Sequence, residues 1–441
     1  MIQAKKILWI LNKYCLDSYI QEKGYIKFLR EIQSRALEEN VQLVYLRFET
    51  INLKHELDVI YPDYNDLEDV NLGSIESNYS FTFKEALYPD LVQLNTRSDF
   101  EVSESQYNQE LVKAKERFIW LEKFLKENSM DLVFFDNSPE YEFFFATLIC
   151  KENKIRAIRA VDGGFFGRTF FREAYIRGNE EIRVCELGVG RSEGDLGLLS
   201  SILNYATAKK QPYDNNFNLP IPRTPSLERV KKALRSFILY FDLLKKSVFY
   251  SSLPSKFVFF GPHLPREGTV HLNGMPFSNQ DSLIRVIARI LPVDTKLVVR
   301  EHPYWHREFK WRTLAYWNSI PNVRIASPKL SIHSILEKAD FVLTINSTTG
   351  LEALYYDKKV LTFSQTFYSK LQNVHYVDNL FDLPRFITLD PSTSRDELVE
   401  FTKSMVLNSV SCTFDSYSFQ DLSAVDKRVD EILRVLNSLI G

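Results

Sequence analysis

Residues 341–363 read FVLTINSTTGLEALYYDKKVLTF, and the order of elements predicted for this segment indicates the fold class. Residues 341–345 form a short apolar run with β-branched side chains and polar neighbours, which predicts a buried strand. A helix is expected to begin within the following Asn-Ser-Thr-Thr-Gly sequence, and residues 360–363 have the composition of another strand. Strand, helix and strand in this order indicate an α/β fold.

The expected start of that helix carries several hydrogen-bond donors. Ser347, Thr348 and Thr349 supply hydroxyl groups, and Gly350 lets the backbone approach a partner closely. The N-terminus of a helix has unpaired N–H groups and a partial positive charge, so it attracts phosphate. A phosphate site and an ordinary Ser/Thr cap of a structural helix are both consistent with this pattern.

A second strand, at residues 296–300 (KLVVR), ends in Glu301, His302 and Pro303. If this strand and the strand at 341–345 share a parallel sheet, their carboxyl ends meet at one edge, where ligands of open α/β sheets bind. Pro303 would restrict the loop that carries His302. An imidazole and a hydroxyl-rich helix start at one edge predict a site for a nucleotide phosphate.

The size and composition of the chain limit the possible classes. A length of 441 residues predicts two domains. The formal net charge of −2 gives no case for binding nucleic acid. Four widely spaced cysteines favour a reducing cytoplasm. No signal peptide or bilayer-spanning apolar run is visible, so we expect a cytoplasmic protein with at most peripheral contact with the inner membrane.

Alternating patterns predict a doubly wound sheet in each half of the chain. In the first half, the expected strands are 6–12, 41–48, 132–135 and 155–161, and the expected helices are 18–39, 107–128, 141–152 and 196–209. In the second half, the expected strands include 257–260 and 323–325, and the expected helices are 227–250, 280–290, 309–317, 397–407 and 422–440.

The domain boundary is expected in residues 211–226, which contain four prolines. This divides the chain into domains 1–225 and 226–441. The last helix, 422–440, is expected to return to the first domain.

Asp162 ends a predicted strand and precedes a glycine loop. This arrangement can present a carboxylate in a cleft, although an Asp-Gly turn is common for purely structural reasons. His302 and His306 are four residues apart, but Pro303 lies between them and Glu301 precedes them, unlike the zinc protease pattern. No metal site is predicted.

Several motifs occur in an order that resembles the bacterial capsule and lipopolysaccharide Kdo transferases of the capsular polysaccharide biosynthesis family. These are strand 257–260, the Glu267 loop with Gly274 and Asn279-Gln280, Glu-His-Pro at 301–303, TINSTTGLEAL at 344–354 and KVLTF at 359–363. The resemblance covers roughly residues 256–368 and, in the first half, the Asp162-Gly163 pair. More distantly, the motifs are similar to those of bacterial sialyltransferases and polysialyltransferases.

The resemblance implies the GT-B fold, in which two Rossmann-like domains face each other across a cleft. It also implies a glycosyltransferase of surface polysaccharide biosynthesis that moves a CMP-activated ulosonic acid, Kdo, to a glycan or glycolipid acceptor, with no metal cofactor. The Kdo transferases imply retention of configuration, and the sialyltransferases imply inversion.

The same resemblance implies roles for individual residues. Asp162 would be the catalytic carboxylate, although Val161 stands where the family often has a second acid. Arg168 would pair with the donor sugar's carboxylate or form an ordinary salt bridge, and Glu352 would bind the ribose or favour the helix dipole. The remaining residues expected in the donor site are His302, Pro303, Ser347, Thr348, Thr349, Gly350, Glu301 and Glu267.

Alternatives from other classes stay open. The missing acid at Val161 is consistent with a non-catalytic GT-B scaffold of a polysaccharide assembly complex. Because phosphate binding does not identify the base, a UDP-sugar transferase is also consistent with the motifs. A sugar-nucleotide epimerase shares the two-domain shape.

Overall fold

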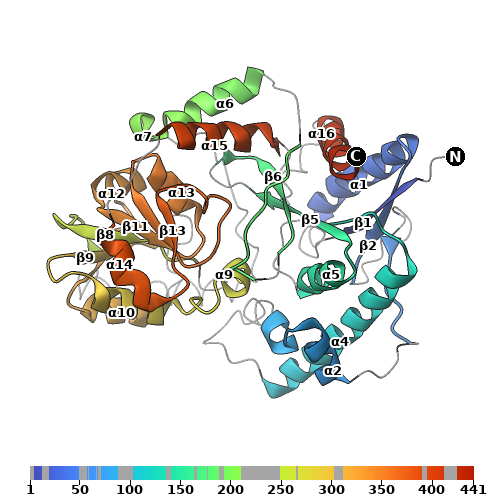
Figure 1. Cartoon of the computed structure of the whole chain (residues 1–441), viewed down its shortest axis with the longest axis horizontal. Coiled ribbons are helices and arrows are strands. Elements are labelled where there is room, and N and C mark those ends of the chain that lie inside the picture. Colours follow the sequence, from blue (N-terminus) through green and yellow to red (C-terminus); the bar gives the residue numbers. More distant parts are fainter. Residues whose placement is uncertain are drawn as a thin grey trace. The chain divides into compact units, whose positions relative to one another are not determined.

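The computed structural model describes most of the chain. The described residues are 4–11, 19–48, 57, 59–65, 67, 71–87, 103–135, 141–162, 166–175, 177–187, 193–209, 249–264, 267–301, 311–389, 395–411 and 425–441. They form two compact units (Figure 1). The first comprises 1–200, 271–273 and 400–441, and the second comprises 201–270 and 274–399.

The first unit contains a seven-stranded sheet in the order β14-β6-β5-β4-β1-β2-β3. Its strands are β1 (Lys5–Ile10), β2 (Val41–Leu46), β3 (Val59–Ile60), β4 (Leu132–Phe135), β5 (Arg156–Asp162), β6 (Thr169–Glu173) and β14 (Ser409–Val410). Strands β1 to β5 pair in parallel, in the 3-2-1-4-5 order of a doubly wound sheet. Strand β6 runs antiparallel to both β5 and β14.

Alternate residues of β1 enter two separate cores, one on each face of this sheet. Ile7 and Trp9 pack with α1 (Tyr19–Glu38) and α16 (Val425–Ile440). Leu8 and Ile10 pack with α2 (Leu72–Tyr79), α4 (Glu104–Glu127) and α5 (Tyr141–Glu152) (Figure 1). This period-two division explains why the strands are apolar throughout.

The C-terminal helix α16 belongs to the first unit, as predicted for residues 422–440. Its apolar side chains are buried in the same core as those of α1, and Arg35 of α1 forms an ion pair with Asp430. The division into 1–225 and 226–441 therefore differs from the observed units in two main places: the second unit begins at residue 201, and residues 400–441 return to the first unit. The physical reason for this return is that α16 buries its apolar stripe beside α1.

The second unit contains a seven-stranded, fully parallel sheet in the order β13-β12-β11-β8-β9-β10-β7. The strands are β7 (Phe249–Tyr250), β8 (Phe257–Phe260), β9 (Lys296–Val299), β10 (Val323–Ala326), β11 (Phe341–Thr344), β12 (Lys359–Thr362) and β13 (Val374–Tyr376). The order β10-β9-β8-β11-β12 repeats the doubly wound order of the first unit.

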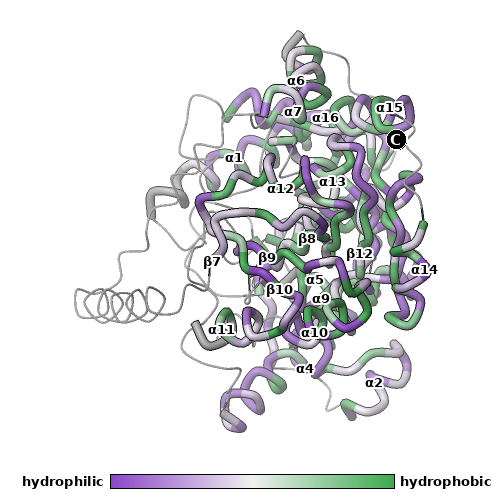
Figure 2. Tube along the Cα trace, turned by 90° about the vertical axis from the view of Figure 1, so that its left-hand side faces the viewer, coloured by the Kyte–Doolittle hydropathy of each residue, from purple (hydrophilic) through white to green (hydrophobic). Residues whose placement is uncertain are grey.

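Helices lie on both faces of the second sheet. Helices α10 (Gln280–Ile290) and α11 (Trp311–Ser319) cover one face, and α12 (Ile332–Lys338) and α13 (Thr348–Leu354) lie on the other (Figure 2). The other helices of the chain are α6 (Glu193–Leu203), α7 (Tyr205–Ala208), α9 (Gly268–Asn273), η3 (Leu380–Asp382), α14 (Leu383–Ile387) and α15 (Arg395–Leu407).

Two Rossmann-like units in one chain confirm the α/β, GT-B fold class. The proline-rich segment 211–226 lies outside the described residues, and so do residues 227–248 of the expected helix 227–250. The last two residues of that expected helix form strand β7, so the prediction is wrong there. The segment between β8 and α10, which carries Glu267, contains the short helix α9. Among the described residues, no helix is both long enough and apolar enough to cross a membrane.

Candidate functional site

The point where the strand order reverses in the second sheet lies between β8 and β11. In doubly wound sheets, ligands bind beyond the carboxyl ends of the strands at this switch point. Strand β9 borders β8 on the other side, so three loops gather at one edge: those after β8, β9 and β11. The prediction that the strands ending near residues 300 and 345 share one parallel sheet is confirmed.

The loop after β11 is held by its own hydroxyl groups. Ser347 is the N-cap of α13, and its Oγ accepts a hydrogen bond from the Thr349 N–H at 3.2 Å. The same hydroxyl donates to Thr349 Oγ1 at 3.2 Å, while the Ser347 N–H donates to Thr344 Oγ1 at 3.1 Å. The hydroxyl of Ser347 therefore serves the helix start, as the ordinary-cap interpretation predicts.

Thr348 differs from its neighbours. It is half-buried at the first helical position, and within the described part of the chain its hydroxyl makes no hydrogen bond. Of the three hydroxyl groups in this loop, that of Thr348 therefore remains fully available to a ligand, while Thr349 Oγ1 accepts from Ser347 and still has its own proton to donate.

Gly350 is required for packing inside the protein. A Cβ atom at this position would lie 2.5 Å from the Tyr368 hydroxyl, 3.0 Å from Val360 and 3.1 Å from Thr344. The Tyr368 hydroxyl donates to the Ser347 carbonyl oxygen, so it cannot simply move away. Gly350 was predicted to allow a close approach, and the partner that it meets is Tyr368.

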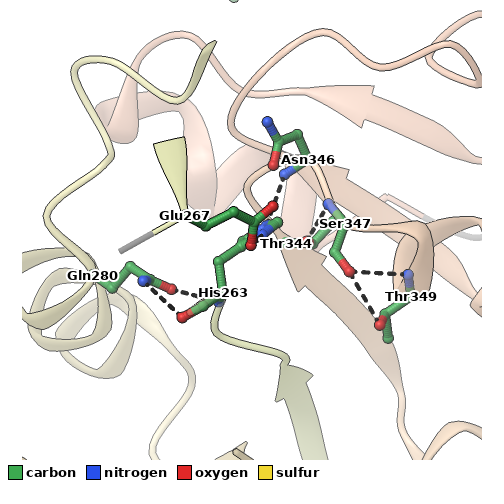
Figure 3. A network of polar contacts seen from close by, with 7 residues as sticks. All are labelled: His263, Glu267, Gln280, Thr344, Asn346, Ser347 and Thr349. Carbon is green, nitrogen blue, oxygen red and sulfur yellow. Dashed lines mark hydrogen bonds and ion pairs between the residues drawn. The ribbon is translucent and has the colours of Figure 1, made fainter. Parts of the chain in front are cut away.

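His263, in the loop after β8, occupies the centre of the site (Figure 3). Its Nδ1 lies 3.1 Å from Glu267 Oε2, and its Nε2 lies 3.4 Å from the backbone nitrogen of Asn346. The side-chain amide of Gln280 holds the His263 backbone through two hydrogen bonds, one to its N–H (2.8 Å) and one to its carbonyl oxygen (3.1 Å). His263 thus links the loop after β8 with the loop after β11.

These contacts determine the tautomer of His263. The Asn346 N–H can only donate, so Nε2 must accept and carries no proton. The proton of the neutral ring then resides on Nδ1 and is donated to the Glu267 carboxylate. The His263 side chain is 6% exposed and the Glu267 side chain is 36% exposed, so the carboxylate is the part of this pair that reaches solvent.

Arg300 and Glu301 follow β9 and are buried. A nitrogen of the Arg300 guanidinium donates to the Pro328 carbonyl oxygen at 3.3 Å. Burial lowers the pKa of Arg300, and the negative charge of Glu352 acts in the opposite direction.

Glu352 lies within α13 and is buried. Its carboxylate accepts a hydrogen bond from the hydroxyl of Tyr205 in α7, and burial raises its pKa to about 7. Its contacts are with protein groups, which suits a structural role better than the proposed contact with a ribose.

Several predicted site residues belong elsewhere or lie outside the described residues. Asp162 is the last residue of β5 in the first unit, where its backbone pairs with Thr169. Arg168 of the same unit forms an ion pair with Asp195 at 2.5 Å, so the ordinary salt-bridge interpretation applies. The Asp162 side chain, residues 163–165, His302 and Pro303 are not described.

The structure brings Glu267, Ser347 and Thr349 into one network and adds three residues with no predicted role: His263, Gln280 and Asn346 (Figure 3). The sequence does indicate a possible role for His263, because this residue lies only three positions after the predicted strand 257–260 and therefore near the ligand-binding edge of the sheet. The described residues contain no group of three or more His, Cys, Asp or Glu side chains placed to hold a metal ion.

Among curated proteins, none matches this chain significantly. A KpsC β-Kdo 2,4 transferase structure from Thermosulfurimonas dismutans has 14% identity and a TM-score of 0.37, covering 62% of this chain and 79% of that chain. A Thermosulfurimonas dismutans KpsC β-Kdo 2,7 transferase structure has 13% identity and a TM-score of 0.33, covering 76% of this chain and 97% of that chain.

A UDP-GlcNAc 2-epimerase from Methanocaldococcus jannaschii has 12% identity and a TM-score of 0.29, covering 96% of this chain and 99% of that chain. The informative match is local: residues 271–371 match the family described as "Capsule polysaccharide biosynthesis protein". This segment begins in α9 and includes the loops after β9 and β11. Residues 271–371, most of which lie in the second unit, are therefore similar to this family, as their motifs predict.

Proposed function

We propose that the protein is a glycosyltransferase of capsule polysaccharide biosynthesis that transfers a CMP-activated ulosonic acid, Kdo, to a glycan or glycolipid acceptor. The observation that carries this proposal is the family match over 271–371, which includes the loops after β9 and β11 at the ligand-binding edge of the second sheet. The donor nucleotide would bind at this edge. A glycolipid acceptor would bring the protein into peripheral contact with the inner membrane.

The chemistry requires stabilisation of charge on the departing nucleotide. As the bond to the sugar breaks, negative charge develops on the phosphate oxygens, and preorganised donors lower the barrier. Thr348, with a hydroxyl that has no partner in the described residues, and His302 of the neighbouring loop would supply these donors. Ser347 would contribute by fixing the loop, because its hydroxyl already caps α13. No metal ion is needed in this scheme.

Asp162 would supply the catalytic carboxylate. In a retaining enzyme this group attacks the anomeric carbon, and in an inverting enzyme it removes the proton of the acceptor hydroxyl. We favour retention because the motifs resemble those of the Kdo transferases. Its position at the carboxyl end of β5 is where doubly wound sheets place functional groups.

Calorimetric titration with CMP, UMP and GMP tests the donor. We expect CMP to bind more tightly than the other two. Binding of UMP without CMP would overturn the CMP assignment and favour a UDP-sugar transferase or an epimerase. An epimerase would in addition release an isomerised sugar nucleotide with no acceptor present. Binding of no nucleotide would favour a non-catalytic scaffold.

Asp162→Asn tests the catalytic assignment. We expect it to abolish transfer while leaving CMP affinity within about twofold, because the carboxylate acts in the chemical step. Asp195→Asn, which removes the partner of Arg168 in the same unit, is the matched control and should retain transfer. Full activity in Asp162→Asn would show that another residue supplies the carboxylate.

A further inference from the structure

His263 is placed by contacts that restrict both its backbone and its ring. Gln280 holds the backbone N–H and carbonyl groups, Glu267 accepts from Nδ1, and Asn346 donates to Nε2 (Figure 3). A buried side chain with this many directional partners has a fixed orientation. No hydrogen of the ring remains for a ligand, and Nε2 is already occupied by the Asn346 amide.

This occupancy excludes His263 as a general base in the structure described. A general base needs an unprotonated nitrogen within reach of the proton that it removes. The unprotonated nitrogen of His263 instead faces the backbone at the start of the loop that leads into Ser347 and Thr348. Any effect of His263 on a ligand at that loop must therefore act through Asn346.

We propose that His263 is a positioning residue for the donor-binding loop, with Glu267 fixing its tautomer and Nε2 holding the Asn346 amide. This inference rests on the proposed function, because the ligand of the loop is taken to be the donor nucleotide. Asn346 directly precedes Ser347 and lies between the end of β11 and the start of α13. A change in its position changes where the Thr348 hydroxyl lies relative to a bound phosphate.

Replacing His263 by glutamine or by asparagine distinguishes this role from simple packing. A glutamine oxygen reaches about as far as Nε2 of a histidine, so His263→Gln can still accept from the Asn346 N–H. An asparagine oxygen reaches only about as far as Nδ1, so His263→Asn keeps a polar group near Glu267 but loses the bond to Asn346. Both variants remove the ring and leave a neutral amide.

The first measurement is hydrogen exchange of the Asn346 amide in the protein without ligand. Since one hydrogen bond of ordinary strength is at stake, we expect exchange to be about 3- to 10-fold faster in His263→Asn than in His263→Gln. Thermal unfolding of both variants verifies that each one is folded. His375→Asn, a histidine of β13 that stacks on Phe386, serves as a control and should leave Asn346 exchange unchanged.

The second measurement is nucleotide affinity, using whichever of CMP, UMP and GMP the wild type binds. We expect His263→Gln to remain within about threefold of the wild type and His263→Asn to bind about 3- to 10-fold more weakly. Donor KM should rise in His263→Asn, with a smaller change in the KM of the acceptor.

The outcomes separate this inference from the proposed function. Equal Asn346 exchange and equal affinity in the two variants would overturn the positioning role, even if CMP binds. If the wild type binds no nucleotide, the proposed function fails and the role of His263 in donor binding fails with it. In that case the exchange rates still decide whether His263 holds the loop.

Discussion

The hydroxyl of Tyr205 donates a hydrogen bond to Oε2 of Glu352, and both side chains are buried. Burial raises the pKa of Glu352 to about 7 from an ordinary 4.5, although the Tyr205 bond and the charge of Arg300 favour the ionised form. The contact connects α7 with α13, the helix that begins at Ser347. A titrating group therefore lies inside the helix that follows the candidate site.

The raised pKa of Glu352 predicts a dependence of stability on pH. The folded state holds this proton more tightly than the unfolded state, so ionisation opposes folding. The penalty is absent below about pH 4.5, grows as the pH rises and is complete above about pH 7. Over this window the free energy of unfolding should fall by on the order of 3 kcal/mol from this group alone.

Glu352→Gln should remove this dependence, because glutamine still accepts from Tyr205 but does not titrate. Urea unfolding of both proteins at pH 5 and pH 8 gives the measurement, and the variant should gain stability relative to the wild type at pH 8. As a control, Glu337→Gln changes an exposed carboxylate whose pKa is lowered by Lys209. That control should keep the wild-type slope, and an identical slope in Glu352→Gln would contradict the prediction.

Gly350→Ala should destabilise the second unit. The added methyl group would lie 2.5 Å from the Tyr368 hydroxyl and close to Val360 and Thr344. Overpacking at a site with little freedom costs about 1–3 kcal/mol. Chemical denaturation measures this loss. Combining the change with Tyr368→Phe removes the oxygen that clashes, so the double variant should lose less than the sum of the two single changes.

A matched glycine shows whether the cost comes from crowding. Gly197 lies in α6, and a Cβ atom there would meet nothing within 4 Å. Gly197→Ala should therefore be neutral or stabilise by up to about 1 kcal/mol through helix propensity. Equal losses at both positions would rule out crowding as the cause.

The local parts of the site could be predicted from the sequence. The strand, cap and helix around Ser347 depend on neighbouring residues, and the short apolar run and hydroxyl-rich helix start are visible within 341–363. The return of α16 to the first unit was also predictable, because such a helix needs another apolar surface to cover its stripe.

The remaining contacts could not be predicted because they join residues far apart in the chain. Tyr205 and Glu352 are 147 residues apart, and His263 and Asn346 are 83 apart. The meeting of His263 and Asn346 depends on strand order, which sets β8 beside β11, and composition does not encode that order. For Gly350, the sequence indicated a close approach, but the identity of Tyr368 as the partner required the fold.

Lys359→Met should destabilise the end of the second unit that carries α14. The buried ammonium group of Lys359 donates to the carbonyl oxygens of Phe386, Ile387 and Leu389, at and beyond the C-terminus of this helix. Methionine fills similar space but leaves these acceptors without their donor, which should cost about 2–3 kcal/mol. Thermal and urea unfolding provide the test. Lys329→Met, at an exposed position, should change stability by no more than about 0.5 kcal/mol.

Substitutions at Ser347 and Thr348 should separate helix capping from ligand binding. Ser347→Ala removes the acceptor of the Thr349 N–H and should cost about 1 kcal/mol of stability. Thr348→Ala removes a hydroxyl with no hydrogen-bond partner in the described residues, so stability should hardly change. Under the proposed function, Thr348→Ala should weaken nucleotide binding about 3- to 10-fold, as measured by calorimetry.

Ser347→Asp gives the sharpest version of this test. Aspartate caps helices as well as serine does, and its charge complements the positive end of the helix dipole, so the variant should be at least as stable as the wild type. The same charge would repel a phosphate at the loop, so nucleotide affinity should fall more than in Ser347→Ala. A stable Ser347→Asp variant that binds nucleotide as tightly as the wild type would place the phosphate elsewhere and leave Ser347 with a structural role alone.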